Sequence, residues 1–174
     1  ERIVNELPLM INMRNLKSLI FSCQFRLINS SVLLAILKQA PNISFFGSSY
    51  DFLMRILDKD KDLCEHLHKM IKSLEVYMFP RLLLANVYRM NLFWEVFSDV
   101  EQLTCEIDKA DAVRFLFAHL TKLIRLKVLA DITLPDLNTA IIEYANICRL
   151  NIHITNSTLY DYAESLIWII RDTN

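Results

Sequence analysis

The feature that most restricts the fold of this chain is its glycine content, because Gly47 is the one glycine among 174 residues. Glycine supplies the positive-φ positions of tight hairpin turns and bulges, and it lets a backbone approach a bound phosphate closely. We therefore expect neither an all-β fold nor a nucleotide-binding α/β fold. The composition is otherwise that of a globular protein, with 53% hydrophobic and 22% charged residues. Together with the helical patterns along the chain, this favours an all-α fold.

The stretch 52–77 shows the clearest helical pattern. An apolar segment, 52–57, is followed by an Asp/Lys-rich turn at 58–62 and then by a longer amphipathic segment. Apolar residues of that longer segment recur at three- and four-residue spacing, the period of one helical face: Leu63, Leu67, Met70, Leu74 and Tyr77. The pattern predicts an αα-hairpin, which cannot bury its apolar faces alone and must stack on neighbours.

Further helical patterns divide the chain into four candidate hairpins, at about 10–39, 49–78, 81–129 and 135–172. Each hairpin carries one cysteine, and the spacings between these cysteines are 41, 41 and 43 residues: Cys23, Cys64, Cys105 and Cys148. This organisation resembles HEAT and armadillo repeats, which have a helix pair every ~40–47 residues. The resemblance implies stacked antiparallel helix hairpins, an α-solenoid with an extended surface for binding macromolecules. The alternative is a compact multi-helix bundle.

In either case we expect residues 1–174 to form a single all-α domain. The chain starts at Glu1 rather than at a methionine, so we expect a fragment of a longer protein.

Two groupings of polar residues could suggest metal chemistry. Asp58, Asp60 and Asp62 resemble the start of a calcium loop, but the glycine and the final glutamate of such a loop are missing. Cys64 and His68 share one face of the predicted helix, whereas a zinc site needs three or four convergent ligands. No phosphate loop or nucleophile motif is present, so we expect no catalytic residue, cofactor or metal.

Four residues are candidates for contact with a partner. Arg114, Lys122 and Arg125 form a basic strip on one predicted helix, 109–129, which could receive an acidic peptide or phosphates. Trp168 lies on the polar face of the last predicted helix, where an exposed tryptophan would be a natural anchor for a partner. The alternative, for a fragment, is that Trp168 packs on the next helix of the longer protein.

The expected function is a non-enzymatic protein–protein interaction scaffold or adaptor segment of a larger intracellular protein or complex. The partners would be other proteins, including an acidic peptide. The net charge of −1 makes nucleic acid the weaker option, and no apolar run is long enough to span a membrane. Cysteines within apolar helical patterns indicate reduced thiols and an intracellular location. The alternatives are a nucleic-acid-associated helical-repeat module and a small all-α enzyme or metal protein.

Overall fold

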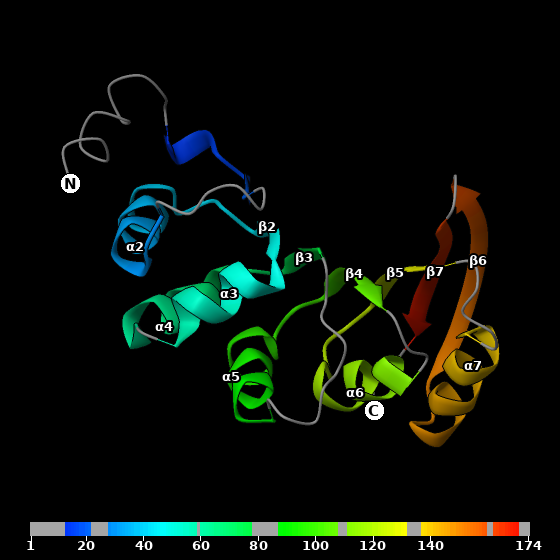
Figure 1. Cartoon of the computed structure of the whole chain (residues 1–174). Helices are drawn as coiled ribbons and strands as arrows, with labels where there is room; N and C mark the ends of the chain where they lie inside the picture. Colours follow the sequence, from blue (N-terminus) through cyan, green and yellow to red (C-terminus); the bar gives the residue numbers. More distant parts are fainter. Residues whose placement is uncertain are drawn as a thin grey trace.

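A computed structural model describes residues 13–21, 28–58, 60–77, 87–107, 111–131, 137–159 and 162–170. Helices and strands alternate along most of the chain (Figure 1). The helices are η1 (Met13–Asn15, a 3-10 turn), α2 (Ser30–Gln39), α3 (Tyr50–Leu57), α4 (Lys61–Met70), α5 (Val87–Phe97), α6 (Asp111–His119) and α7 (Leu137–Ile147). The strands are β1 (Ser18–Ile20), β2 (Phe45–Ser49), β3 (Ser73–Tyr77), β4 (Gln102–Ile107), β5 (Arg125–Asp131), β6 (Asn151–Leu159) and β7 (Tyr162–Ile170).

The strands form a single seven-stranded sheet in the order β1-β2-β3-β4-β5-β7-β6. The first five strands are parallel and neighbour one another in chain order. The last two form an antiparallel hairpin, and β7 joins it to β5. The fold is therefore α/β, and the expectation of an all-α fold is wrong for both the solenoid of helix hairpins and the compact helix bundle.

The repeating unit is a strand followed by one or two helices. One core residue from each parallel strand lies in register with the next, and these residues are Leu19, Phe46, Leu74, Leu103 and Leu126. Their separations are 27, 28, 29 and 23 residues. A unit of that length, with its strands in sequential order, is a strand–helix solenoid, in which each unit contacts chiefly its neighbours.

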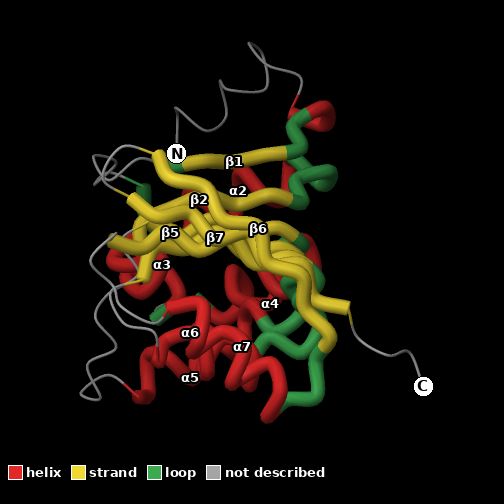
Figure 2. Tube along the Cα trace, turned by 90° about the vertical axis from the view of Figure 1, so that its right-hand side faces the viewer, coloured by secondary structure: helices red, strands yellow, loops and turns green. Residues whose placement is uncertain are grey.

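The structure has two layers, the sheet and a layer of helices. Figure 2 shows the strands together and α3 to α7 gathered on one side of them, and α2 packs beside α4 in the same layer. The core lies between the two layers, where alternate strand residues such as Phe46, Leu103 and Leu126 are at most 1% exposed. The other residues of each strand point to the opposite face of the sheet, which the described helices do not cover.

The helix pair predicted around 52–77 is partly confirmed. The Ser49 side chain accepts a hydrogen bond from the Phe52 N–H and caps α3, and the Asp60 carboxylate accepts one from the Leu63 N–H and caps α4. The prediction is wrong beyond Met70, because the chain leaves the helix there and forms β3. Alternation replaces helical spacing in β3, where Leu74 and Val76 are buried and Tyr77 is half-buried.

The helix predicted over 109–129 is really a helix, a turn and a strand. Leu120, Leu123 and Leu126 are fully buried at three-residue intervals, which the sequence presents as part of one helical face. In the structure Leu120 accepts a backbone hydrogen bond from Leu123 in a turn after α6, and Leu126 already belongs to β5. The first half of the hairpin predicted at 81–129 is likewise not helical throughout, because α5 ends at Phe97 and is followed by β4.

The prediction of a C-terminal helix is also wrong, because β6 and β7, between residues 151 and 170, form an antiparallel hairpin. The cysteine spacing has no structural meaning either. Cys64 lies on α4, Cys105 on β4 and Cys148 just beyond α7, while Cys23 lies outside the described residues. The resemblance to HEAT and armadillo repeats is therefore overturned, and so is the description of residues 1–174 as an all-α domain.

Scarcity of glycine is compatible with this α/β fold because the described connections hardly use positive φ. Arg149 is the one described residue with positive φ, at 54°. It stands where glycine commonly ends a helix: its N–H bonds to the Asn146 carbonyl, and the Leu150 N–H bonds to the Ala145 carbonyl. Gly47 has a different role, since a Cβ there would lie 3.2 Å from Cγ1 of Ile20, the residue paired with it on β1.

Candidate functional site

The basic strip predicted on one helix does not exist as such. Arg114 is on α6, Lys122 lies in the turn after α6, and Arg125 opens β5. Arg114 places its guanidinium 5.7 Å from the ring centre of Tyr144 on α7. Lys122 forms an ion pair of 2.7 Å with Asp99, in the turn that precedes β4. These two basic side chains therefore contact neighbouring units, and the three basic residues lie on a helix, a turn and a strand rather than along one helix.

Arg125 and Trp168, in contrast, lie together. They are directly paired in the antiparallel ladder between β5 and β7. The guanidinium carbon of Arg125 lies 5.3 Å from the ring centre of Trp168, within the range of a cation–π contact. Trp168 is nevertheless 44% exposed, so much of its indole remains open to solvent. The sequence singled out both residues but placed them on separate helices.

Both residues belong to a row of side chains on the face of the sheet that the described helices leave uncovered. In register from edge to edge this row is Ser18, Phe45, Ser73, Gln102, Arg125, Trp168 and His153. The adjacent row on the same face is Ile20, Gly47, Glu75, Thr104, Lys127, Leu166 and Thr155. We call this surface the open face. Small and polar side chains occupy its middle, while its large exposed apolar groups lie toward its ends.

Ile170 extends the apolar character of the open face at the hairpin. It is two residues beyond Trp168 on β7, so it points to the same side, and it is 60% exposed. Trp168 and Ile170 thus present a tryptophan and an isoleucine beside the guanidinium of Arg125. Such a combination of an aromatic ring, an aliphatic side chain and a paired cation is typical of the central residues of protein interfaces.

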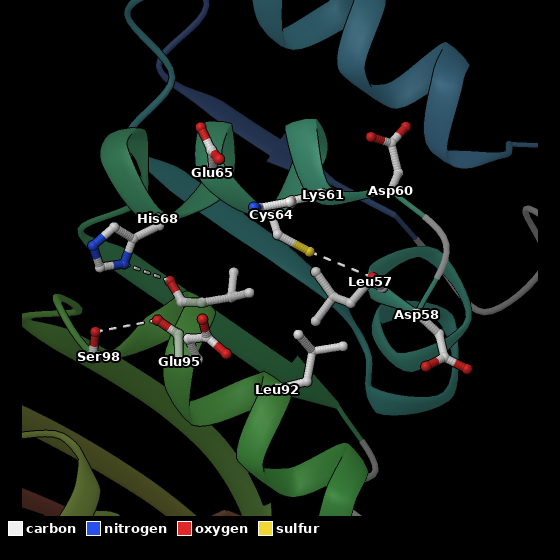
Figure 3. A pocket seen from close by; sticks show the side chains of 11 residues that line it. Leu57, Asp58, Asp60, Lys61, Cys64, Glu65, His68, Leu92, Glu95 and Ser98 are labelled. Atoms are coloured by element: carbon white, nitrogen blue, oxygen red, sulfur yellow. Dashed lines mark hydrogen bonds between the residues drawn. The ribbon is translucent and has the colours of Figure 1, made fainter.

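A groove in the helix layer is another candidate binding site. It has a volume of about 720 Å³ and lies between α3, α4 and α5. Figure 3 shows Leu57, Cys64 and Leu92 in its middle, with the acidic groups of Asp58, Asp60, Glu65 and Glu95 around them. No local sequence pattern indicates this groove, because its lining comes from two helix termini and from a helix about 30 residues further along the chain.

Cys64 and His68 line this groove but are not arranged as a nucleophile and its base. The Cys64 thiol donates to the Leu57 carbonyl oxygen at 3.4 Å. Burial, and then the carboxylates of Asp60 and Glu95, raise the pKa of this thiol, which disfavours the reactive thiolate. His68 Nδ1 lies 3.1 Å from the Val96 carbonyl oxygen. Because that oxygen only accepts, we assign the proton to Nδ1, so this nitrogen cannot take a proton from the thiol.

Metal-ligating residues do not converge in the part of the chain that the structure describes, where no group of three or more His, Cys, Asp or Glu side chains could hold an ion. Asp60 illustrates the reason, since its carboxylate caps α4. Within the same described ranges, none of the helices has the length and apolar character needed to cross a membrane.

Comparison of the chain with known protein families and with curated protein sequences finds no match.

Proposed function

We propose that this chain is a protein-interaction module without a reaction of its own, which binds a partner protein on the open face of its sheet. The observation that carries the proposal is the position of Trp168. This side chain is 44% exposed on a sheet face that the described helices leave uncovered, and the Arg125 guanidinium contacts it from the neighbouring strand. Tryptophan and arginine are enriched among the residues that contribute most to protein interfaces.

The architecture supports the same function. The helices that the structure describes lie on one side of the sheet and leave its opposite face uncovered, an arrangement that leucine-rich repeats share. The likeness is one of architecture. In this chain the outward positions of five parallel strands and the hairpin form one continuous surface.

The chemistry of the open face favours an acidic partner segment with apolar side chains. A carboxylate can bind the guanidinium of Arg125 while an apolar side chain packs on the indole of Trp168 and on Ile170. We propose an intracellular location, which the free thiols of Cys64 and Cys105 support because intracellular proteins rarely carry stable disulfides. Nucleic acid gains no support, since Arg114, Lys122 and Arg125 do not lie along one helix as the basic strip required.

The test compares capture of partner proteins by the wild-type chain and by two variants. Trp168→Ala removes the exposed indole of the open face, and Phe115→Ala removes an exposed ring, 40% accessible, from the helix layer. Both variants are first checked for an unchanged thermal unfolding transition. The captured proteins are then identified and quantified by mass spectrometry, and cross-links are mapped in each complex.

We expect Trp168→Ala to weaken capture of the specific partner by about 30-fold or more, as for other central interface residues. Phe115→Ala should leave capture unchanged, and cross-links should lie on β5 and β7. Equal loss from both variants, undiminished capture by Trp168→Ala, or the absence of any captured partner would each contradict the proposal.

A further inference from the structure

The groove between α3, α4 and α5 lies in the helix layer, away from the open face, and the proposed function does not use it. Its floor is apolar and consists of Leu57, Leu92 and Val96 together with the Cys64 thiol. Its volume of about 720 Å³ falls within the range of roughly 300–1,000 Å³ that is usual for binding sites. The groove can therefore accommodate several side chains of a ligand.

The charges around the groove are predominantly negative. Four carboxylates line it, those of Asp58, Asp60, Glu65 and Glu95, against the single ammonium of Lys61. Lys69 lies 3.9 Å from the Glu65 carboxylate on an exposed helix face and offsets one of the four only weakly. The surplus of negative charge selects a cationic ligand.

Two helix C-termini add to this negative potential, while the N-terminal end of α4, capped by the Asp60 carboxylate, opposes it. Helix α3 ends at Leu57 and α5 ends at Phe97, and residues of both last turns line the groove. The carbonyl ends of helices carry partial negative charge. The Cys64 thiol and the His68 ring bond to two of these carbonyls, Leu57 and Val96, which places both helix ends at the wall of the groove.

We propose that this groove binds a basic segment of a partner protein, in which a lysine or arginine side chain lies among the carboxylates and a neighbouring apolar side chain packs on Leu57 and Leu92. The apolar floor distinguishes this ligand from a free metal ion or a polyamine, which would leave the floor unused. The site is independent of the open face, so a negative result at one surface does not bear on the proposal for the other.

The experiment titrates isotope-labelled protein with a capped hexapeptide of alternating leucine and lysine and follows the backbone amide signals by NMR. A peptide of alternating leucine and glutamate is the matched control. We expect the lysine peptide to shift the amide signals of Leu57, Cys64 and Leu92 saturably, with binding that weakens as salt is added. The glutamate peptide should leave these signals unchanged.

A pair of variants then tests the role of the carboxylates. Asp58→Asn combined with Glu95→Gln removes two exposed charges of the groove. Asp51→Asn combined with Glu143→Gln removes two exposed charges outside it and serves as the control. We expect the groove pair to weaken the lysine peptide about two- to fivefold for each carboxylate, and the control pair to have no effect.

The proposal is overturned if the lysine peptide shifts no groove signal at millimolar concentration, or if the glutamate peptide produces the same shifts. It is also overturned if the control pair weakens binding as much as the groove pair. Because all four substituted side chains are exposed and lie outside the core, each variant should retain the wild-type NMR spectrum away from its substitutions.

Discussion

The open face has a different character over the parallel strands and over the C-terminal hairpin. In the middle of the parallel part its outward side chains are small or polar, as at Ser73, Gln102 and Thr104. On β7 of the hairpin they include Trp168 and Ile170, which are large, apolar and exposed. One sheet thus combines a polar middle and an apolar end.

The inward face shows no such difference. Phe46, Leu103 and Leu126 of the parallel strands and Ile167 of β7 are all almost completely buried against the helix layer. The hydrophobic effect therefore explains the inward residues of both regions in the same way. It does not explain an exposed tryptophan on β7, and this contrast is the physical reason for placing a partner there. Ile20, 53% exposed at the opposite edge, has a local packing role over Gly47.

The largest expected effect tests whether inward side chains of the sheet contribute to folding stability and outward side chains do not. Phe46→Ala in the parallel part removes a fully buried ring, and it should lower the free energy of unfolding by about 3–5 kcal/mol. Ile170→Ala on the hairpin should change it by less than about 0.5 kcal/mol, because that side chain is mostly exposed. Urea unfolding measures both, and a large loss from Ile170→Ala would mean that the open face is covered.

The next effect concerns Cys105, which lies in the inward row of β4. Burial raises the pKa of this thiol from 9.0 to about 12. Near pH 9 the Cys105 thiol of the unfolded chain loses its proton while the buried thiol keeps it, which favours the unfolded state. The stability that burial of the protonated thiol contributes is therefore complete below pH 9 and falls as the pH rises toward 12.

Between pH 8 and pH 10.5 the wild-type protein should therefore lose about 2 kcal/mol more stability than Cys105→Ala, which has no thiol to titrate. Urea unfolding at a series of pH values gives this difference. Parallel pH profiles for the two proteins would show that Cys105 is accessible to water, and would contradict the burial of β4 under the helix layer.

A smaller effect, a gain in the free energy of unfolding, is expected from a substitution at Arg149, just before the hairpin. Arg149 has φ of 54°, a conformation that costs a residue with a Cβ roughly 1 kcal/mol relative to glycine. Arg149→Gly should therefore raise the free energy of unfolding by about 0.5–1 kcal/mol, whereas Arg149→Ala should leave it nearly unchanged. Thermal unfolding compares the two, and destabilisation by Arg149→Gly would argue against the described turn between α7 and β6.

The smallest effect concerns the ion pair between Lys122 and Asp99, which links the last two units of the parallel part. The hydrogen bond from Lys122 lowers the pKa of Asp99. The ion pair therefore contributes to folding stability at neutral pH, and this contribution is lost as the pH falls through the lowered pKa. Because both groups are substantially exposed, Lys122→Met should cost at most about 0.5 kcal/mol. Urea unfolding at low and at high salt should show this cost only at low salt, and a larger cost would indicate a buried contact.

The sequence alone predicts much of the helix layer. Ser49 as a cap, the Asp/Lys turn before α4, and Leu63 and Leu67 on its buried face all follow from local rules. Helix α2 also ends at Gln39, just before Pro41, as the proline predicts. Local hydrogen bonding and helical spacing are enough to fix these elements.

The strands escape prediction for a physical reason. Leu120, Leu123 and Leu126 follow one another at three-residue intervals, a spacing that fits a helical face as well as a turn leading into a strand. Only pairing with distant strands separates the two, as when Leu103 aligns with Leu126. The signal that could have revealed it is the recurrence of buried strand positions every 23 to 29 residues.

The candidate site was predicted residue by residue but not as an assembly. Arg125 and Trp168 were selected individually, yet their contact depends on antiparallel pairing across 43 positions of the sequence. Their role in partner binding stays a prediction, as does the absence of catalysis. The groove around Leu57 and Leu92 was missed because no local pattern brings α3 and α5 together.

The most direct test of the central claim is hydroxyl-radical footprinting of the wild-type protein, read at each aromatic residue by mass spectrometry. Trp168 on the open face is 44% exposed, and Trp94 in the helix layer is 7% exposed. We expect Trp168 to be oxidised several times faster than Trp94, and to become protected when the captured partner is added while Phe115 does not. Equal, slow oxidation of both tryptophans in the free protein, or undiminished oxidation of Trp168 in the complex, would contradict the account.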